Sequence, residues 1–112
     1  MRSLTRMLLL SALALAWLAQ PVRAQSAADL QAAGEAFQQG QRAQVQGDFA
    51  QAAELFDLAH HTAPSAGALR SALRMHQSAG HHATAAMRAA EALASYPDDA
   101  ATVALANEVL AA

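Results

Sequence analysis

Histidine is the residue in this sequence with the most obvious capacity for chemistry, and it occurs as two adjacent pairs and one single residue: His60, His61, His76, His81 and His82. Imidazole nitrogen is a good ligand for zinc or copper. The two pairs fall at the end of one expected helix and at a later turn, so we expect them at opposite ends of the molecule. We therefore predict no metal site and no cofactor, and we interpret His81 and His82 as solvent-facing turn residues. Histidine-based metal handling is the least favoured alternative.

Signatures of catalysis are absent from the sequence. It contains no cysteine, no Gly-x-Ser-x-Gly elbow, no glycine-rich phosphate loop and no His-Glu-x-x-His helix. Asp98 and Asp99 form a carboxylate pair, but they follow Pro97 at an expected helix start, where acidic side chains favour the helix dipole. Glu54 and Asp57 are interpreted as parts of solvated helix faces. These observations predict a protein that is not an enzyme.

Alanine-rich segments separated by turn residues predict an all-α chain. Residues 25–112 contain 28 alanines, and alanine is the strongest helix former. Ser26, Asp48 and Ser65 precede three of these segments and have side chains that cap helices. The expected helices cover about residues 27–46, 49–62, 66–78, 83–95 and 99–111, with Asp98 as the cap of the last.

Residues at helical spacing predict which helix faces are buried. In the second expected helix, small residues flank the large ring of Phe56, which lets a neighbouring helix approach closely. In the first helix, Leu30, Ala33, Phe37 and Gly40 mark one face. The inward positions of the others are Ala52, Leu55, Phe56 and Ala59 in the second helix, Leu69, Leu73 and His76 in the third, Ala85, Ala89, Ala92 and Leu93 in the fourth, and Val103, Leu105, Val109 and Leu110 in the fifth.

Part of the sequence recurs at a constant offset, so that Gly47 corresponds to Gly80 and Pro64 to Pro97. The first unit resembles a tetratricopeptide repeat, a pair of antiparallel helices with a period of about 34 residues. In the second unit, Ala89 stands where the first has an aromatic ring. The residues that carry the resemblance are Gly40, Gly47, Asp48, Phe49, Ala52, Phe56, Ala59 and Pro64.

The resemblance implies a right-handed stack of two antiparallel helix hairpins. The repeats would cover about residues 33–65 and 66–98, and a capping helix would cover about residues 99–111. Together they would form one domain over residues 25–112. An array of helix hairpins from another family is the alternative architecture.

The resemblance also implies a peptide-binding groove lined by the first helix of each pair. Arg70 and Arg74 are one helical turn apart, so both could address a carboxylate of the partner. The alternative is that Phe37 belongs to the core and that the two arginines keep an alanine-rich helix soluble. Arg88, on the following helix, is expected to point outward in either case. The implied groove residues are Phe37, Gln41, Gln44, Arg70, Arg74 and Gln77, followed by Val103 and Asn107.

Residues 1–24 have the pattern of a cleavable secretion signal. Arg2 and Arg6 supply positive charge before Met7–Ala19, an apolar run that is short for a membrane span. Cleavage is predicted after Ala24, which would place the remaining chain in the periplasm or outside the cell. An uncleaved membrane anchor is the alternative.

The charge of residues 25–112 excludes one class of partner. Four arginines and nine acidic residues give a formal net charge of −5, so nucleic acid is not expected to bind. We predict a non-enzymatic protein–protein interaction module of the bacterial cell envelope, a scaffold that binds an acidic or carboxylate-bearing peptide or a subunit. The alternative is a structural or oligomerisation subunit, since association often stabilises a small domain.

Overall fold

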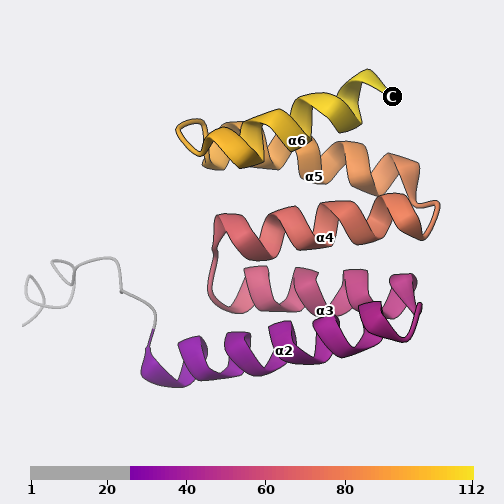
Figure 1. Cartoon of the computed structure of the whole chain (residues 1–112). Helices are drawn as coiled ribbons and strands as arrows, with labels where there is room; N and C mark the ends of the chain where they lie inside the picture. The colour runs from indigo at the N-terminus through magenta and orange to yellow at the C-terminus, as the bar shows by residue number, and fades with distance from the viewer. Residues whose placement is uncertain (1–25) are drawn as a thin grey trace, which may run out of the picture.

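The computed structural model describes residues 26–112, which form five α-helices and no β-strand (Figure 1). The prediction of an all-α chain is confirmed for this part. The expected secretion signal, residues 1–24, lies outside the described residues. The helices are α2 (Ala27–Val45), α3 (Phe49–Thr62), α4 (Ala66–Ser78), α5 (His82–Ser95) and α6 (Ala100–Ala111).

A short polar side chain caps the start of four of the five described helices. The side chain before α5, His81, makes no capping hydrogen bond. The expected cap of the last helix was wrong by one position, because Asp99 rather than Asp98 accepts the backbone N–H of Thr102, at 3.0 Å. The other helices begin with an oxygen that accepts the backbone N–H three residues ahead, on Ser26, Asp48 and Ser65.

Two glycines end α2 and α4 in the same way. Gly47 and Gly80 have φ angles of +77° and +78°, in the left-handed region that glycine enters without steric cost. The residue after each glycine donates its N–H to the carbonyl five residues earlier, at 2.9 Å for Asp48 and 2.8 Å for His81. The recurrence in the sequence therefore corresponds to a repeated turn.

The helices are stacked in chain order, and their connections lie at alternate ends of the stack (Figure 1). Each helix packs against the next one along the chain, and α6 also contacts α4. As the third of the five described helices, α4 occupies the middle of the stack.

The buried core is divided between the two halves of the stack. Phe56 of α3 has only 1% of its surface exposed and packs with residues of α2 and α4. Leu69 and Leu73 of α4 face the other way and pack with α5 and α6. Leu30 of α2, expected on the same face as Ala33 and Gly40, is instead 57% exposed. Ala85, Ala89 and Ala92 of α5 are all buried, as their spacing predicted, and Leu93 is half-buried. The small alanine side chains let α5 lie close to both neighbours.

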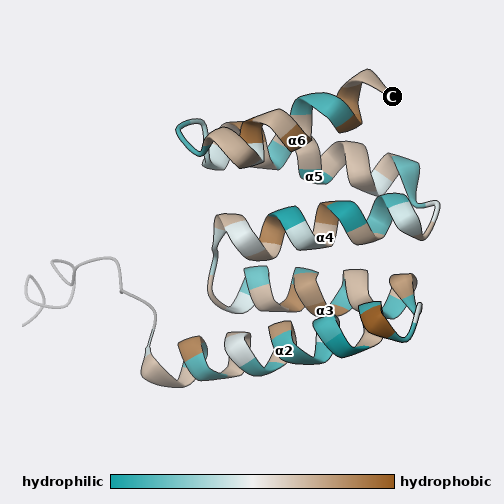
Figure 2. Cartoon of the chain, in the orientation of Figure 1, coloured by the Kyte–Doolittle hydropathy of each residue, from teal (hydrophilic) through white to brown (hydrophobic). Residues whose placement is uncertain are grey.

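The last helix buries a different face from the one expected. Leu105 and Val109 are buried as predicted, but Leu110 is 48% exposed, and Thr102 is buried instead. Successive residues on α6 are about 100° apart around the helix axis, so Val109 and Leu110 cannot both face α5. Figure 2 shows that α6 is hydrophobic over most of its length, apart from a hydrophilic segment toward its C-terminal end.

Within residues 26–112, none of the helices combines the length and the apolar character that a membrane span needs.

Candidate functional site

Phe37, Gln41 and Gln44 lie along one edge of α2 at helical spacing. The Phe37 ring is half-buried and tilted by 56° against the ring of Phe56, with 5.0 Å between the ring centroids. Gln41 and Gln44 are exposed. Phe37 therefore contributes to the core and also borders the surface, so the two interpretations of this residue are compatible.

An apolar hollow of about 260 Å³ adjoins Phe37. It lies where the first half of α2 meets the end of α3 and the start of α4. Its walls are mainly alanine, leucine and phenylalanine, and the polar group of Ser65 already accepts the N–H of Ala68 as a helix cap, at 3.1 Å. The hollow therefore offers apolar contact to a bound group. Its lining residues are Leu30, Ala33, Gly34, Phe37, Ala59, Ala63, Ser65 and Ala68.

The two arginines expected to act as a pair have different surroundings. Arg70 donates from one guanidinium nitrogen to Asp99, at 3.2 Å, and to the hydroxyl of the buried Thr102, at 2.9 Å. Arg74 is exposed and forms no ion pair within residues 26–112. Arg70 thus joins α4 to the start of α6, whereas the charge of Arg74 is available to a partner.

The remaining groove residue, Gln77, lies toward the other end of α4. It is half-buried and lines a hollow of about 330 Å³ together with residues of α5 and α6, including His82 and Leu110. Val103 is half-buried and Asn107 is exposed on α6. Phe37 and Gln77 therefore border separate hollows, and the six expected residues are spread along α2 and α4 instead of meeting in one cavity.

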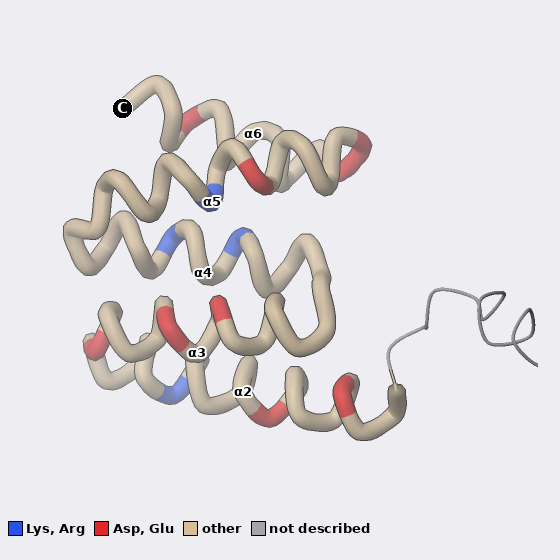
Figure 3. Tube along the Cα trace, turned by 180° about the vertical axis from the view of Figure 1, so that it is seen from behind, with Lys and Arg blue, Asp and Glu red and all other residues tan. Residues whose placement is uncertain are grey.

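The charges differ from helix to helix. Figure 3 shows only basic segments on α4, while every other helix carries at least one acidic segment. The two basic residues of α4 are Arg70 and Arg74. The middle helix is thus a local positive strip in a region whose net charge is negative.

A polar network joins α3, α4 and α5, and it was not expected from the sequence. The Asp57 carboxylate on α3 accepts hydrogen bonds from Arg88 Nε, at 2.8 Å, and lies 2.7 Å from His76 Nε2. Arg88 also lies 3.6 Å from Glu91. Asp57 is half-buried and Arg88 is paired, so the interpretations of Asp57 as a solvated residue and of Arg88 as an outward one were both wrong.

The network determines the charge state of its carboxylate. Burial alone would raise the pKa of Asp57, but the hydrogen bonds from Arg88 and His76 outweigh it and lower the pKa below its ordinary value. His76 is only 5% exposed. No buried side-chain nitrogen or oxygen in residues 26–112 lacks a hydrogen-bond partner. The position of His76 in an apolar stripe was the one sequence signal for this network, because a buried imidazole needs a polar partner.

The histidine pairs lie apart, as expected. His60 forms a 3.1 Å contact with the Tyr96 hydroxyl and lies 3.8 Å from Glu91, whereas His81 lies at the turn before α5. Burial, and then the charge of Glu91, raise the pKa of Tyr96 above its ordinary value. Within the described part of the chain, no three histidine or carboxylate side chains are grouped so as to hold a metal ion.

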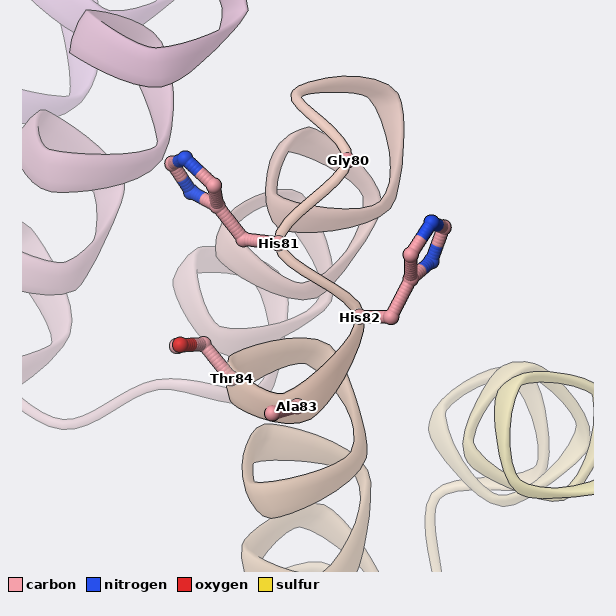
Figure 4. Close-up of a pocket in the computed structure, with 5 residues that line it drawn as sticks. All are labelled: Gly80, His81, His82, Ala83 and Thr84. Atoms are coloured by element: carbon pink, nitrogen blue, oxygen red, sulfur yellow. The ribbon is translucent and has the colours of Figure 1, made fainter.

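His81 and His82 are both exposed, as predicted, but their rings point to opposite sides of the chain (Figure 4). His81 Nδ1 lies 3.3 Å from His76 Nδ1, and the ring centroids are 5.6 Å apart. The ring centroids are farther apart than the two Nδ1 atoms by about twice the distance from an imidazole centre to its nitrogen. Both nitrogens therefore lie close to the line that joins the two ring centroids. That is the geometry of a direct N–H···N hydrogen bond. A zinc ion bound to both nitrogens at ~2.0–2.1 Å in tetrahedral geometry would instead lie off this line.

Comparison of the chain with protein-family models, with curated proteins and with solved structures gave no match.

Proposed function

We propose that residues 26–112 are a non-enzymatic protein-binding module of the bacterial cell envelope, built as a right-handed stack of two tetratricopeptide-like antiparallel hairpins, α2–α3 and α4–α5, with α6 as the cap. The matching turns at Gly47 and Gly80 support this architecture. So does the contact of Gly40 with Phe56, a small residue of one helix against the large ring of its neighbour. We also propose that secretion and cleavage after Ala24 deliver the module to the periplasm or beyond.

Arg74 is the observation that supports this function most strongly. It is exposed, it has no ion-pair partner within residues 26–112, and it lies on the helix of the described region that carries no acidic residue. A guanidinium forms two parallel hydrogen bonds with a carboxylate. We infer that the partner is a peptide or subunit with a carboxylate for Arg74 and an apolar side chain for the hollow beside Phe37. Gln41 and Gln44 would supply amide hydrogen bonds along α2.

Arg70 has a supporting role in this proposal. Its guanidinium is already bonded to Asp99 and Thr102, so it positions α6 beside α4. Replacing Arg70 would leave the hydroxyl of the buried Thr102 without this donor, and the loss would affect folding as well as binding.

Site-specific photo-crosslinking in intact cells tests the proposal. A photoreactive residue at Gln44, on the proposed binding edge, should capture an envelope protein, whereas one at Gln38, which is exposed on another side of α2, should not. The captured protein is then titrated by calorimetry against Arg74→Glu and against Arg42→Glu, whose arginine is also exposed and forms no ion pair within residues 26–112. Equal capture at the two sites, or equal loss of affinity in the two variants, would exclude this binding face.

The outer side of α6 favours a second candidate function, oligomerisation or docking on a larger envelope complex. Leu110 is half-exposed, and the other exposed positions of α6 are alanine except for Asn107 and Glu108. A helix that is apolar on most sides is typically covered by a partner. Analytical ultracentrifugation separates the candidates, because a structural subunit should change mass with concentration and Leu110→Glu should abolish that change. A constant monomer mass would leave the peptide-binding module as the better proposal.

A further inference from the structure

The contact between His76 and His81 lies outside the proposed binding face and joins three elements. His76 of α4 is held from α3 by Asp57, at 2.7 Å from Nε2, and meets the turn before α5 through His81, at 3.3 Å from Nδ1. Arg88 of α5 binds the same carboxylate. His82, the remaining titratable group at this turn, points away on the other side of the chain (Figure 4).

The carboxylate determines which nitrogen of His76 carries a proton. The lowered pKa of Asp57 keeps it ionised and able only to accept hydrogen bonds. His76 Nε2 must therefore be the donor in its hydrogen bond with Asp57. In neutral His76 the other nitrogen, Nδ1, is then a bare acceptor, and His81 Nδ1 must supply the proton that lies between the rings.

The number of protons on the two rings decides whether this contact can exist. With both rings neutral, His81 donates to His76. With one extra proton, either ring can still donate to the bare nitrogen of the other, and the bond becomes charge-assisted. With two extra protons, both Nδ1 atoms carry hydrogen, so no acceptor remains and two positive charges face each other. The contact therefore tolerates one added proton and fails with the second.

We propose that the His76–His81 contact is a pH-operated latch on the turn between α4 and α5, closed at neutral pH and opened by acid when both rings become protonated. His76 keeps its place on opening, because its imidazolium still pairs with Asp57. The His81 ring is exposed and free to leave. The backbone bond from His81 N–H to the His76 carbonyl, at 2.8 Å, keeps the turn formed. Acid thus loosens one end of the stack without unfolding it.

Nitrogen NMR of the histidine rings tests the latch directly. The sample is the protein isolated from cells that express the full chain. An N–H···N bond transmits a scalar coupling between the two nitrogens. We expect this coupling between His76 Nδ1 and His81 Nδ1 at pH 8 and its loss near pH 5, with helical circular dichroism unchanged. Absence of the coupling at pH 8, or its persistence at pH 5, would overturn the proposal.

Hydrogen exchange provides the second measurement. Loss of one neutral hydrogen bond corresponds to about a two- to tenfold change in a local opening equilibrium. The amides of Gly80, His81 and Ala85 are hydrogen-bonded at this turn. Between pH 8 and pH 5, and after correction for intrinsic rates, their exchange should rise by that factor in the wild-type protein and in His61→Gln, a matched control at an exposed histidine. His81→Gln cannot titrate and should show no such rise. An equal rise in His81→Gln would show that the response comes from another group.

Discussion

A glycine-to-alanine change at Gly40 tests the packing between α2 and α3. A Cβ atom at this position would lie 2.8 Å from Cε1 and 2.9 Å from Cδ1 of Phe56. Real Cβ atoms do not approach this closely, so the ring or the helix must shift. The ring has little room to move, because it is 1% exposed and packs against Phe37. We therefore expect Gly40→Ala to overpack the core.

Two effects oppose each other in this variant. Alanine in place of glycine inside a helix stabilises by about 1 kcal/mol, while overpacking a filled core costs about 1–3 kcal/mol. Gly34→Ala is the matched control, since Gly34 lies in the same helix and a Cβ there would have no atom within 4 Å. The helix term is common to both variants, so the difference between their unfolding free energies isolates the steric term, about 1–3 kcal/mol in favour of Gly34→Ala.

Thermal unfolding followed by circular dichroism measures this difference. For a domain of this size, each kcal/mol corresponds to about 4–8 °C in Tm. Gly34→Ala should melt above the wild-type protein, and Gly40→Ala at or below it. If the two variants melted at the same raised temperature, the contact between Gly40 and Phe56 would be absent in solution, and the packing of α2 on α3 would have to differ from that described.

Three further predictions concern the core, the polar network and the leader. Phe56→Ala should destabilise by about 3–5 kcal/mol in urea unfolding, since a fully buried ring leaves a cavity, and a change below about 1 kcal/mol would contradict the burial. Asp57→Asn should cost about 1–3 kcal/mol at pH 7. Because the pKa of Asp57 is lowered in the folded state, the ionised carboxylate adds to the free energy of unfolding above about pH 4. This contribution disappears as the pH falls through the folded pKa, so the wild-type and Asp57→Asn unfolding curves should converge in acid. Intact-mass analysis of the exported protein should give Gln25 as the first residue, and retention of residues 1–24 in the membrane fraction would contradict it.

The local parts of the fold could be predicted because their causes lie within a few residues. A cap such as Asp48 acts on the N–H three residues ahead, and a turn glycine such as Gly47 acts on carbonyls within one helical turn. Helix bounds therefore follow from the sequence to within one residue. The same locality explains the error at Asp98, since two adjacent aspartates satisfy the same cap pattern and only the backbone selects between them.

The polar contacts between helices could not be predicted in this way. Asp57, His76 and Arg88 meet across 19 and 31 residues of sequence, and their meeting depends on how far each helix is rotated about its axis. Helical periodicity gives the buried side of a helix but not which neighbour covers which part of that side. A single charged residue beside an apolar stripe is therefore compatible with solvent and with a buried partner alike.

Helical periodicity does not show which neighbour a residue contacts, and this decides which variant can test the proposed binding face. Periodicity places Arg70 and Arg74 on one side of α4 and treats them as equivalent. They differ because α6 begins with Asp99 and Thr102 beside Arg70, a position set by the length of α5 and its turn. Reversing both charges would break an internal contact together with the proposed external one, and Arg88 cannot be the control because it holds Asp57. A single change at Arg74, compared with Arg42, alters one exposed charge in each protein, so a difference in affinity between them reports on the binding face alone.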